Sequence, residues 1–196
     1  LVGRATQLYA TSGWRPAFRA PGGRWAEVSI ARLIASEGDA YEPISRMIEL
    51  AEQHDAELPD MLRWNFAAWG AAYAVEQGHW ALVERALRGL DELGAELPRP
   101  PGRRQRAEVA VMRAELDHAR GDAATMRRRL AELAAEDDPY NAGVFARAAM
   151  LRATDALDRG RPAEALDALA DAVARYDVLP KHLGPRYHRL RRAALE

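Results

Sequence analysis

Two residues on one predicted helix have the spacing of a metal-binding or acid–base pair. Glu115 and His118 lie three positions apart, which places a carboxylate and an imidazole on the same helix face, as in carboxylate-bridged metal sites. A metal site needs further inward-facing ligands. Glu76 and His79 do not form a second copy, because Gly78 interrupts the helix between them. We therefore interpret Glu115 and His118 as a surface hydrogen-bonding pair.

Arginine clusters are the other residues that could bind a charged ligand. Arg127, Arg128 and Arg129 are consecutive, so on a helix they point in three directions, and acidic residues follow at 132 and 136–138. This pattern favours a solvated helix surface over a phosphate track. The arginines between 186 and 192 are less balanced and are the better nucleic-acid candidate. With 28 basic and 29 acidic residues the net charge is -1, and we do not expect nucleic-acid binding.

The known catalytic motifs are absent from the sequence. It contains no nucleophile elbow, phosphate loop, dinucleotide fingerprint or HExxH motif, and no cysteine. Thiolate chemistry, disulfides and cysteine metal sites are therefore excluded. We expect no enzymatic activity, no cofactor and no metal.

Length and composition indicate one or two folded domains. The 196 residues are 48% apolar and 29% charged. The longest strongly apolar stretch, residues 66–75, is about half of the roughly 20 residues that span a bilayer. We expect no membrane contact and a cytoplasmic location. Because the chain begins with Leu1, we also expect it to be a piece of a longer protein.

A repeat of turn glycines runs along the chain. Gly38, Gly78, Gly121 and Gly160 are separated by 40, 43 and 39 residues, and each lies between two helical patterns. A glycine after a helix suits a left-handed C-terminal cap. We predict that the backbone reverses direction at all four.

Equivalent positions around these glycines carry equivalent residues. Alanine lies seven residues before each glycine, at 31, 71, 114 and 153. Nine and twelve residues after each glycine lie Met or Leu and then Leu or Ala, which gives an i, i+3 apolar stripe on the second helix. We expect the small residue on the first helix to allow close approach of the second.

The pattern predicts an all-α chain of four antiparallel helical hairpins with an extra helix at each end. The proposed segments are an N-terminal helix and loop at 1–23, the hairpins at 24–178 and a C-terminal helix at 179–196. The predicted helices are 24–36, 43–56, 60–76, 80–93, 105–119, 123–135, 140–158, 162–176 and 185–195, besides one within 2–12.

Over residues 24–178 the chain resembles the tetratricopeptide repeat family. The best local match is Gly160-Arg161-Pro162-Ala163-Glu164-Ala165-Leu166, with Ala153 before it and Leu169 after it. The period is near 40 instead of the family's 34, and is similar to the divergent repeats of large ATP-binding LuxR-type bacterial transcription regulators. The resemblance implies a right-handed α-solenoid in which the first helices line a concave groove.

The resemblance also implies which side chains face that groove. The polar candidates are Trp25, Arg32, Asn65, Glu76, Glu108, Glu115, His118, Arg147 and Thr154, with Val28, Ala68, Val111 and Met150 as the apolar floor. We expect a protein or peptide interaction module within a larger bacterial regulator. The alternatives are a small-molecule effector sensor, a helical enzyme, a nucleic-acid binder, or a groove face that is solvated or packed against the rest of a longer chain.

Overall fold

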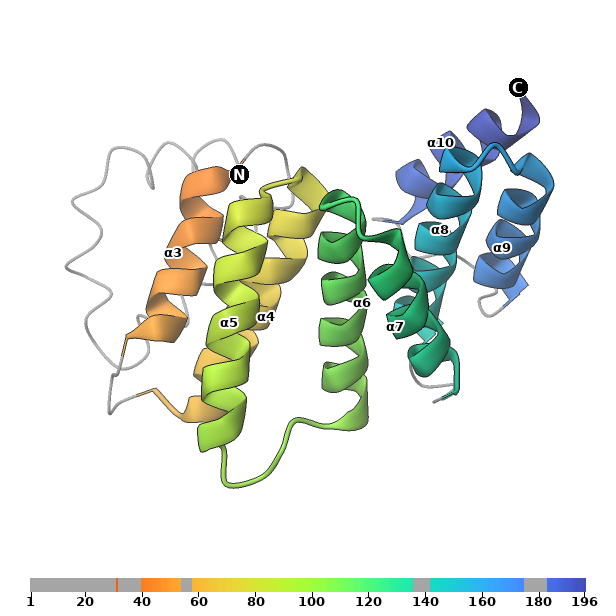
Figure 1. Ribbon diagram of the computed structural model, residues 1–196. Helices are drawn as coiled ribbons and strands as arrows, with labels where there is room; N and C mark the ends of the chain where they lie inside the picture. Colours follow the sequence, from red (N-terminus) through yellow and green to blue (C-terminus); the bar gives the residue numbers. More distant parts are fainter. Residues whose placement is uncertain (1–30, 32–39, 54–57, 136–141, 175–182) are drawn as a thin grey trace. The chain divides into compact units, whose positions relative to one another are not determined.

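The computed structural model describes residues 31, 40–53, 58–135, 142–174 and 183–196 (Figure 1). These residues form helices with turns and loops between them, and none of them lies in a strand. The all-α prediction is confirmed over this part of the chain. The predicted helix and loop at 1–23, and all of the first predicted repeat helix except Ala31, lie outside the described residues. The chain divides into two units, Leu1–Pro101 and Gly102–Glu196.

The helices of both units follow the predicted ranges closely. They are α3 (Tyr41–Glu52), α4 (Asp60–Gln77), α5 (Trp80–Glu96), α6 (Arg103–Ala119), α7 (Ala123–Ala135), α8 (Ala142–Asp158), α9 (Pro162–Ala174) and α10 (Gly184–Leu195). Two helix ends differ clearly. The first is α3, which ends at Glu52 instead of residue 56, because the backbone at Gln53 is extended. The second is α5, which continues through Gly94 to Glu96 instead of ending at Leu93. Glycine inside a helix is only modestly unfavourable, so it does not by itself end one.

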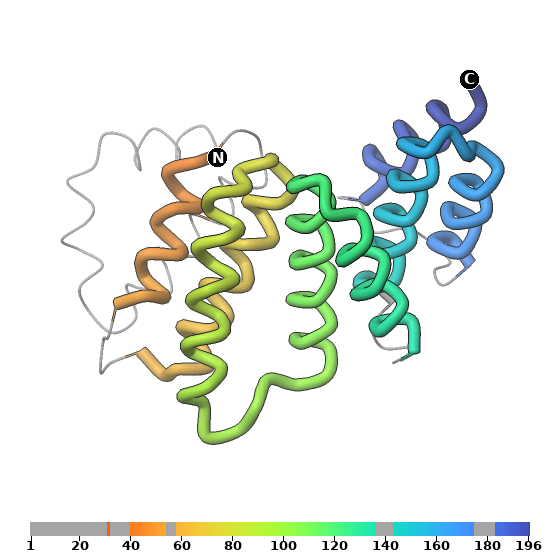
Figure 2. Tube along the Cα trace, viewed as in Figure 1, coloured from red at the N-terminus to blue at the C-terminus, as the bar shows by residue number. Residues whose placement is uncertain are grey.

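The turns between paired helices share one backbone design. Gly78, Gly121 and Gly160 have φ angles of 74°, 77° and 67°, in the left-handed region that favours glycine. In Figure 2 the tube reverses direction between α4 and α5, between α6 and α7, and between α8 and α9. After each glycine the next residue donates its N–H to a carbonyl five residues earlier, in the pairs His79 to Ala74, Asp122 to Asp117 and Arg161 to Ala156, at 2.8 to 2.9 Å. These are Schellman caps, which satisfy the last carbonyls of a helix. The predicted reversals are confirmed at three glycines, and Gly38 lies outside the described residues.

The repeated columns of apolar residues form the interior. The four alanines seven residues before the turn glycines, at 31, 71, 114 and 153, are at most 1% exposed. The apolar stripe of the second helices is buried as well, at positions 47, 50, 87, 90, 130, 133, 169 and 172. The prediction that these columns are buried is therefore confirmed. Helix pairs α4 with α5, α6 with α7 and α8 with α9 pack against each other.

In the first unit, α4 lies between α3 and α5 and is covered on more than one side. Its buried residues include both Phe66 and Trp64, which fall on different stripes of the helix. Arg63 is also buried, and its Nε donates to the Ala51 carbonyl at 3.0 Å near the end of α3. Arg63 therefore caps a neighbouring helix instead of reaching solvent.

Two glycines in this unit predict opposite effects of the same substitution. A Cβ at Gly70 would lie 2.7 Å from Cγ1 of the buried Ile48, whereas a Cβ at Gly89 would meet nothing within 4 Å. We expect Gly70→Ala to lower the free energy of unfolding by about 1 to 2 kcal/mol through overpacking. Gly89→Ala should raise it by about 1 kcal/mol, because alanine is the better helix former. Urea denaturation followed by tryptophan fluorescence measures both, and equal effects would contradict the packing between α3 and α4.

In the second unit, α8 is the central helix. One buried cluster joins α6, α7 and α8 around Met126, Phe145 and Leu151. A second cluster joins α8, α9 and α10, and includes Met150 and Leu183. Because α8 supplies side chains to both clusters, it fixes the positions of the polar groups described next.

Candidate binding surfaces of the second unit

Among the groove residues predicted in the first unit, the structure describes those on α4. Trp25 and Arg32, with Val28, lie outside the described residues. On α4, Asn65 is half-buried, Ala68 is buried and Glu76 is exposed. Whether these residues contact a partner remains a prediction.

Two of the groove residues predicted in the second unit bind each other. The Glu115 side chain on α6 is only 2% exposed, and its carboxylate accepts hydrogen bonds from Nε and Nη2 of Arg147 on α8, at 3.3 and 2.7 Å. Arg186 on α10 donates from Nη1 to the same carboxylate at 2.7 Å. This buried cluster links α6, α8 and α10. Arg147 and Arg186 together supply the hydrogen bonds to the Glu115 carboxylate, so the cluster stabilises the packing of the three helices.

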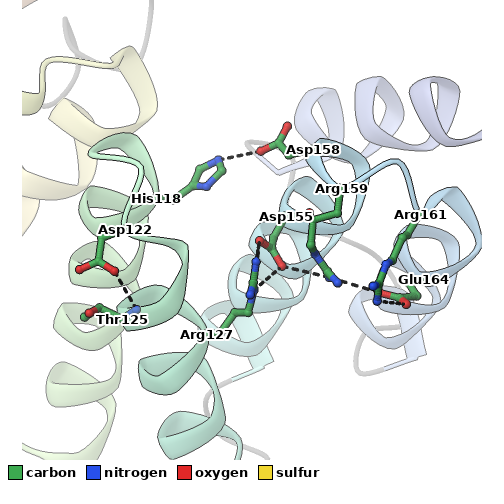
Figure 3. Close-up of polar contacts among 9 residues, drawn as sticks. All are labelled: His118, Asp122, Thr125, Arg127, Asp155, Asp158, Arg159, Arg161 and Glu164. Atoms are coloured by element: carbon green, nitrogen blue, oxygen red, sulfur yellow. Dashed lines mark hydrogen bonds and ion pairs between the residues drawn. The ribbon is translucent and has the colours of Figure 1, made fainter.

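The remaining groove candidates of the second unit also contact residues of that unit. His118 on α6 lies 3.5 Å from Asp158 on α8, measured from Nε2 to Oδ2 (Figure 3). The Thr154 hydroxyl donates to the Met150 carbonyl one turn earlier on α8. Glu108 pairs with Arg104 on the exposed side of α6. His118 therefore pairs with Asp158 on a neighbouring helix. The predicted hydrogen bond between His118 and Glu115 is wrong, because the Glu115 carboxylate is buried and bound to Arg147 and Arg186.

The predicted apolar floor of the second unit is interior. Val111 belongs to the buried cluster of α6, α7 and α8, and Met150 to that of α8, α9 and α10. Both are at most 1% exposed. These two side chains therefore serve packing.

The three consecutive arginines of α7 point in three directions, as predicted. Arg127 binds Asp155 on α8, Arg129 binds Asp117 on α6 at 2.6 Å, and Arg128 lies 4.0 Å from Glu132 on its own helix. Each guanidinium has a carboxylate partner. This geometry agrees with a solvated, ion-paired helix surface.

Asp155 is the buried centre of a second charged network. Its side chain is 7% exposed, and both oxygens accept hydrogen bonds from Arg127, at 3.0 Å from Nε and 3.0 Å from Nη2 (Figure 3). Arg159 approaches the same carboxylate at 3.1 Å and also reaches Glu164 on α9 at 3.2 Å. The network therefore links α7, α8 and α9.

The charges around Asp155 set its protonation. Burial alone would raise the pKa of Asp155, but the hydrogen bonds from Arg127 and the positive charges of Arg127 and Arg159 outweigh it, so the pKa is lowered. The same contact raises the pKa of Arg127. Nearby, the Thr125 backbone N–H donates to Asp122 at 3.0 Å and lowers the pKa of that carboxyl at the start of α7.

The lowered pKa of Asp155 predicts a pH-dependent contribution to stability. A carboxyl whose folded pKa lies below its unfolded value stabilises the fold above the unfolded value of about 4, and loses this contribution as the pH falls through the folded pKa. We expect Asp155→Asn to lower the free energy of unfolding by about 2 kcal/mol at neutral pH. The difference from wild type should shrink in acid. Urea denaturation at a series of pH values measures it, and a difference independent of pH would contradict the charged pair.

Beside this network lies a groove of about 530 Å³ between α7, α8 and α9, named here the α7–α9 groove. From α7 it is lined by Met126, Arg127, Leu130, Ala131 and Ala134. From α8 it is lined by Arg152, Asp155, Ala156 and Arg159. From α9 it is lined by Glu164, Asp167, Ala168 and Asp171. The groove combines an apolar floor with charged walls.

Sequence reasoning missed the α7–α9 groove because it assigned binding to the first helices. One local signal was present. On α9, Glu164, Asp167 and Asp171 follow an i, i+3, i+7 pattern, which places them on one edge.

The described residues show no group of three or more His, Asp or Glu side chains arranged to hold a metal ion. In the same part of the chain, no helix is both long enough and apolar enough to span a bilayer. Comparisons with protein-family models, with curated proteins and with solved structures found no match to this chain.

Proposed function

We propose that this chain is a protein or peptide interaction module made of tetratricopeptide-like hairpins, within a larger bacterial regulator. The proposed architecture is a right-handed solenoid of about four hairpins. The three Schellman turns of one design and the buried alanine column support a repeat. The observation that carries the binding function is the α7–α9 groove, an open cavity of about 530 Å³ with an apolar floor.

A random peptide library displayed on phage and selected on the immobilised protein tests this proposal. We expect selected peptides to bind in the micromolar range or tighter. Ala131→Trp fills the groove from its α7 wall, and should weaken binding at least tenfold. Ala124→Trp places the same side chain on an exposed position of α7 outside the groove lining, and should leave binding unchanged. A library that yields no peptide would refute the module, and peptides insensitive to Ala131→Trp would exclude this groove.

The volume of the groove also favours a second candidate, a small-molecule effector site. Ligand pockets in proteins have volumes of about 300 to 1,000 Å³, and the α7–α9 groove falls in that range. An effector would raise the free energy of unfolding by about 2.7 kcal/mol at one hundred times its dissociation constant. A thermal-shift screen with metabolites distinguishes this candidate, since a peptide module shows no such gain.

A further inference from the structure

The α7–α9 groove lies between α7 and α9, which are the second helices of two consecutive predicted hairpins. In the first unit, the consecutive second helices α3 and α5 pack against each other. In the second unit, α7 packs on α6 and α8, and α9 packs on α8 and α10. No contact of this kind joins α7 to α9 among the described residues. The two helices, each of 13 residues and roughly 20 Å long, therefore border the α7–α9 groove, which lies over α8.

The two walls of the α7–α9 groove differ in polarity and charge. The α7 wall is largely apolar, and its exposed Ala131 and Ala134 allow a partner backbone to approach closely. The α9 wall carries the exposed carboxylates of Glu164, Asp167 and Asp171 along one edge. An occupant in contact with both walls must be apolar on one side and compatible with negative charge on the other.

Most charges in the groove are already paired. Asp155 pairs with Arg127 and Arg159, and Glu164 pairs with Arg159 and Arg161. Each arginine in these contacts therefore has a carboxylate partner.

The remaining carboxylates of the α9 wall are open to a partner. Asp171 faces Arg152 at 3.5 Å in an exposed pair, which is easily exchanged. For Asp167, alone among the charged residues of the groove lining, the described part of the chain shows no ion pair or hydrogen bond. The groove lining therefore carries three arginines against four carboxylates, and Asp167, the carboxylate without a partner among the described residues, lies at the middle of the α9 wall.

We propose that the α7–α9 groove docks an amphipathic helix of a partner protein, with a Lys or Arg of that helix against Asp167. This inference rests on the proposed function and names its partner. A helix fits because the α7–α9 groove runs between two helices. The apolar side chains of an amphipathic helix recur at i, i+3, i+4 and i+7, so they can line one side of such a groove. Apolar anchors contact Leu130, Ala131 and Ala134, while the basic edge lies along α9. A second cation of the partner replaces Arg152 at Asp171.

Two synthetic fluorescein-labelled peptides test the proposal. Both are amphipathic helices with the same leucine and alanine face, and they differ only in carrying lysine or glutamate along one edge of that face. In fluorescence anisotropy titrations of the whole chain, we expect the lysine peptide to bind saturably and at least tenfold tighter than the glutamate peptide. Equal or tighter binding of the glutamate peptide, or no binding of the lysine peptide, would overturn the proposal.

Charge variants locate the contact. Asp167→Asn should weaken binding of the lysine peptide about threefold, on the scale of an exposed ion pair, and Asp167→Lys about tenfold. Glu132→Lys is the matched control, because it makes the same change of charge at an exposed position of α7 outside the groove lining. It should alter binding less than twofold. Equal losses in both lysine variants would show only general electrostatic attraction and would overturn the role of Asp167.

Failure of this inference can be separated from failure of the proposed function. If the peptide library yields groove binders without a basic edge, the proposed interaction module is supported and the proposed docking of a basic helix is refuted. If no library peptide binds, both fail. Sedimentation of the protein alone examines a second copy of the chain as the occupant. Self-association that Ala131→Trp abolishes would assign the groove to that copy and overturn the proposal.

Discussion

Replacing Glu115 with alanine is expected to lower the free energy of unfolding by about 3 kcal/mol. The substitution leaves Arg147 and Arg186, which are 16% and 29% exposed, without their shared carboxylate. Removing one partner of a buried ion pair typically costs about 3 to 5 kcal/mol, because the remaining charge stays desolvated. The partial exposure of both arginines places the expected value at the lower end of this range.

The effect of Glu115→Ala should be local to the second unit. All five tryptophans precede residue 81, so tryptophan fluorescence reports on the first unit. Urea denaturation by far-UV circular dichroism gives the overall loss, and hydrogen exchange measured by mass spectrometry should show faster exchange in α6, α8 and α10. Glu108→Ala is the control on the same helix, since its pair with Arg104 is exposed, and it should change stability by less than about 0.5 kcal/mol. Equal losses in the two variants would contradict the buried cluster.

Enlarging the alanine column should have an effect of similar size. Ala153 on α8 is fully buried, in one cluster with Leu169 and Ala172 of α9. The leucine of Ala153→Leu needs room for three more carbon atoms where two helices are in close contact. Overpacking of a filled core costs about 1 to 3 kcal/mol, and this site allows little adjustment, so we expect about 3 kcal/mol.

Ala170→Leu provides the matched control for this substitution. Ala170 is exposed on α9, so the same side chain added there should change the free energy of unfolding by less than about 0.5 kcal/mol. Urea denaturation followed by circular dichroism measures both variants. If Ala153→Leu is as well tolerated as Ala170→Leu, the alanine column does not set the distance between α8 and α9.

Much of the local structure could be predicted from the sequence because its causes are local. The reversals at Gly78, Gly121 and Gly160 follow from the need for a left-handed residue after a helix. The buried alanines and the apolar stripes follow from the helical period of 3.6 residues. Ends such as that of α5 were less predictable, because a single glycine weakens a helix without stopping it.

The sequence by itself therefore determined the described helices, the three described turns, and the buried alanine column and apolar stripes. Only the tertiary structure decided that Glu115 meets Arg147 and Arg186, which lie 32 and 71 residues further along the chain. It also decided that α7 and α9 stand apart with a groove between them. The physical reason is that ion pairs and grooves depend on the rotation and spacing of packed helices. A linear pattern leaves both undetermined, because the same helical periodicity is compatible with several packing geometries.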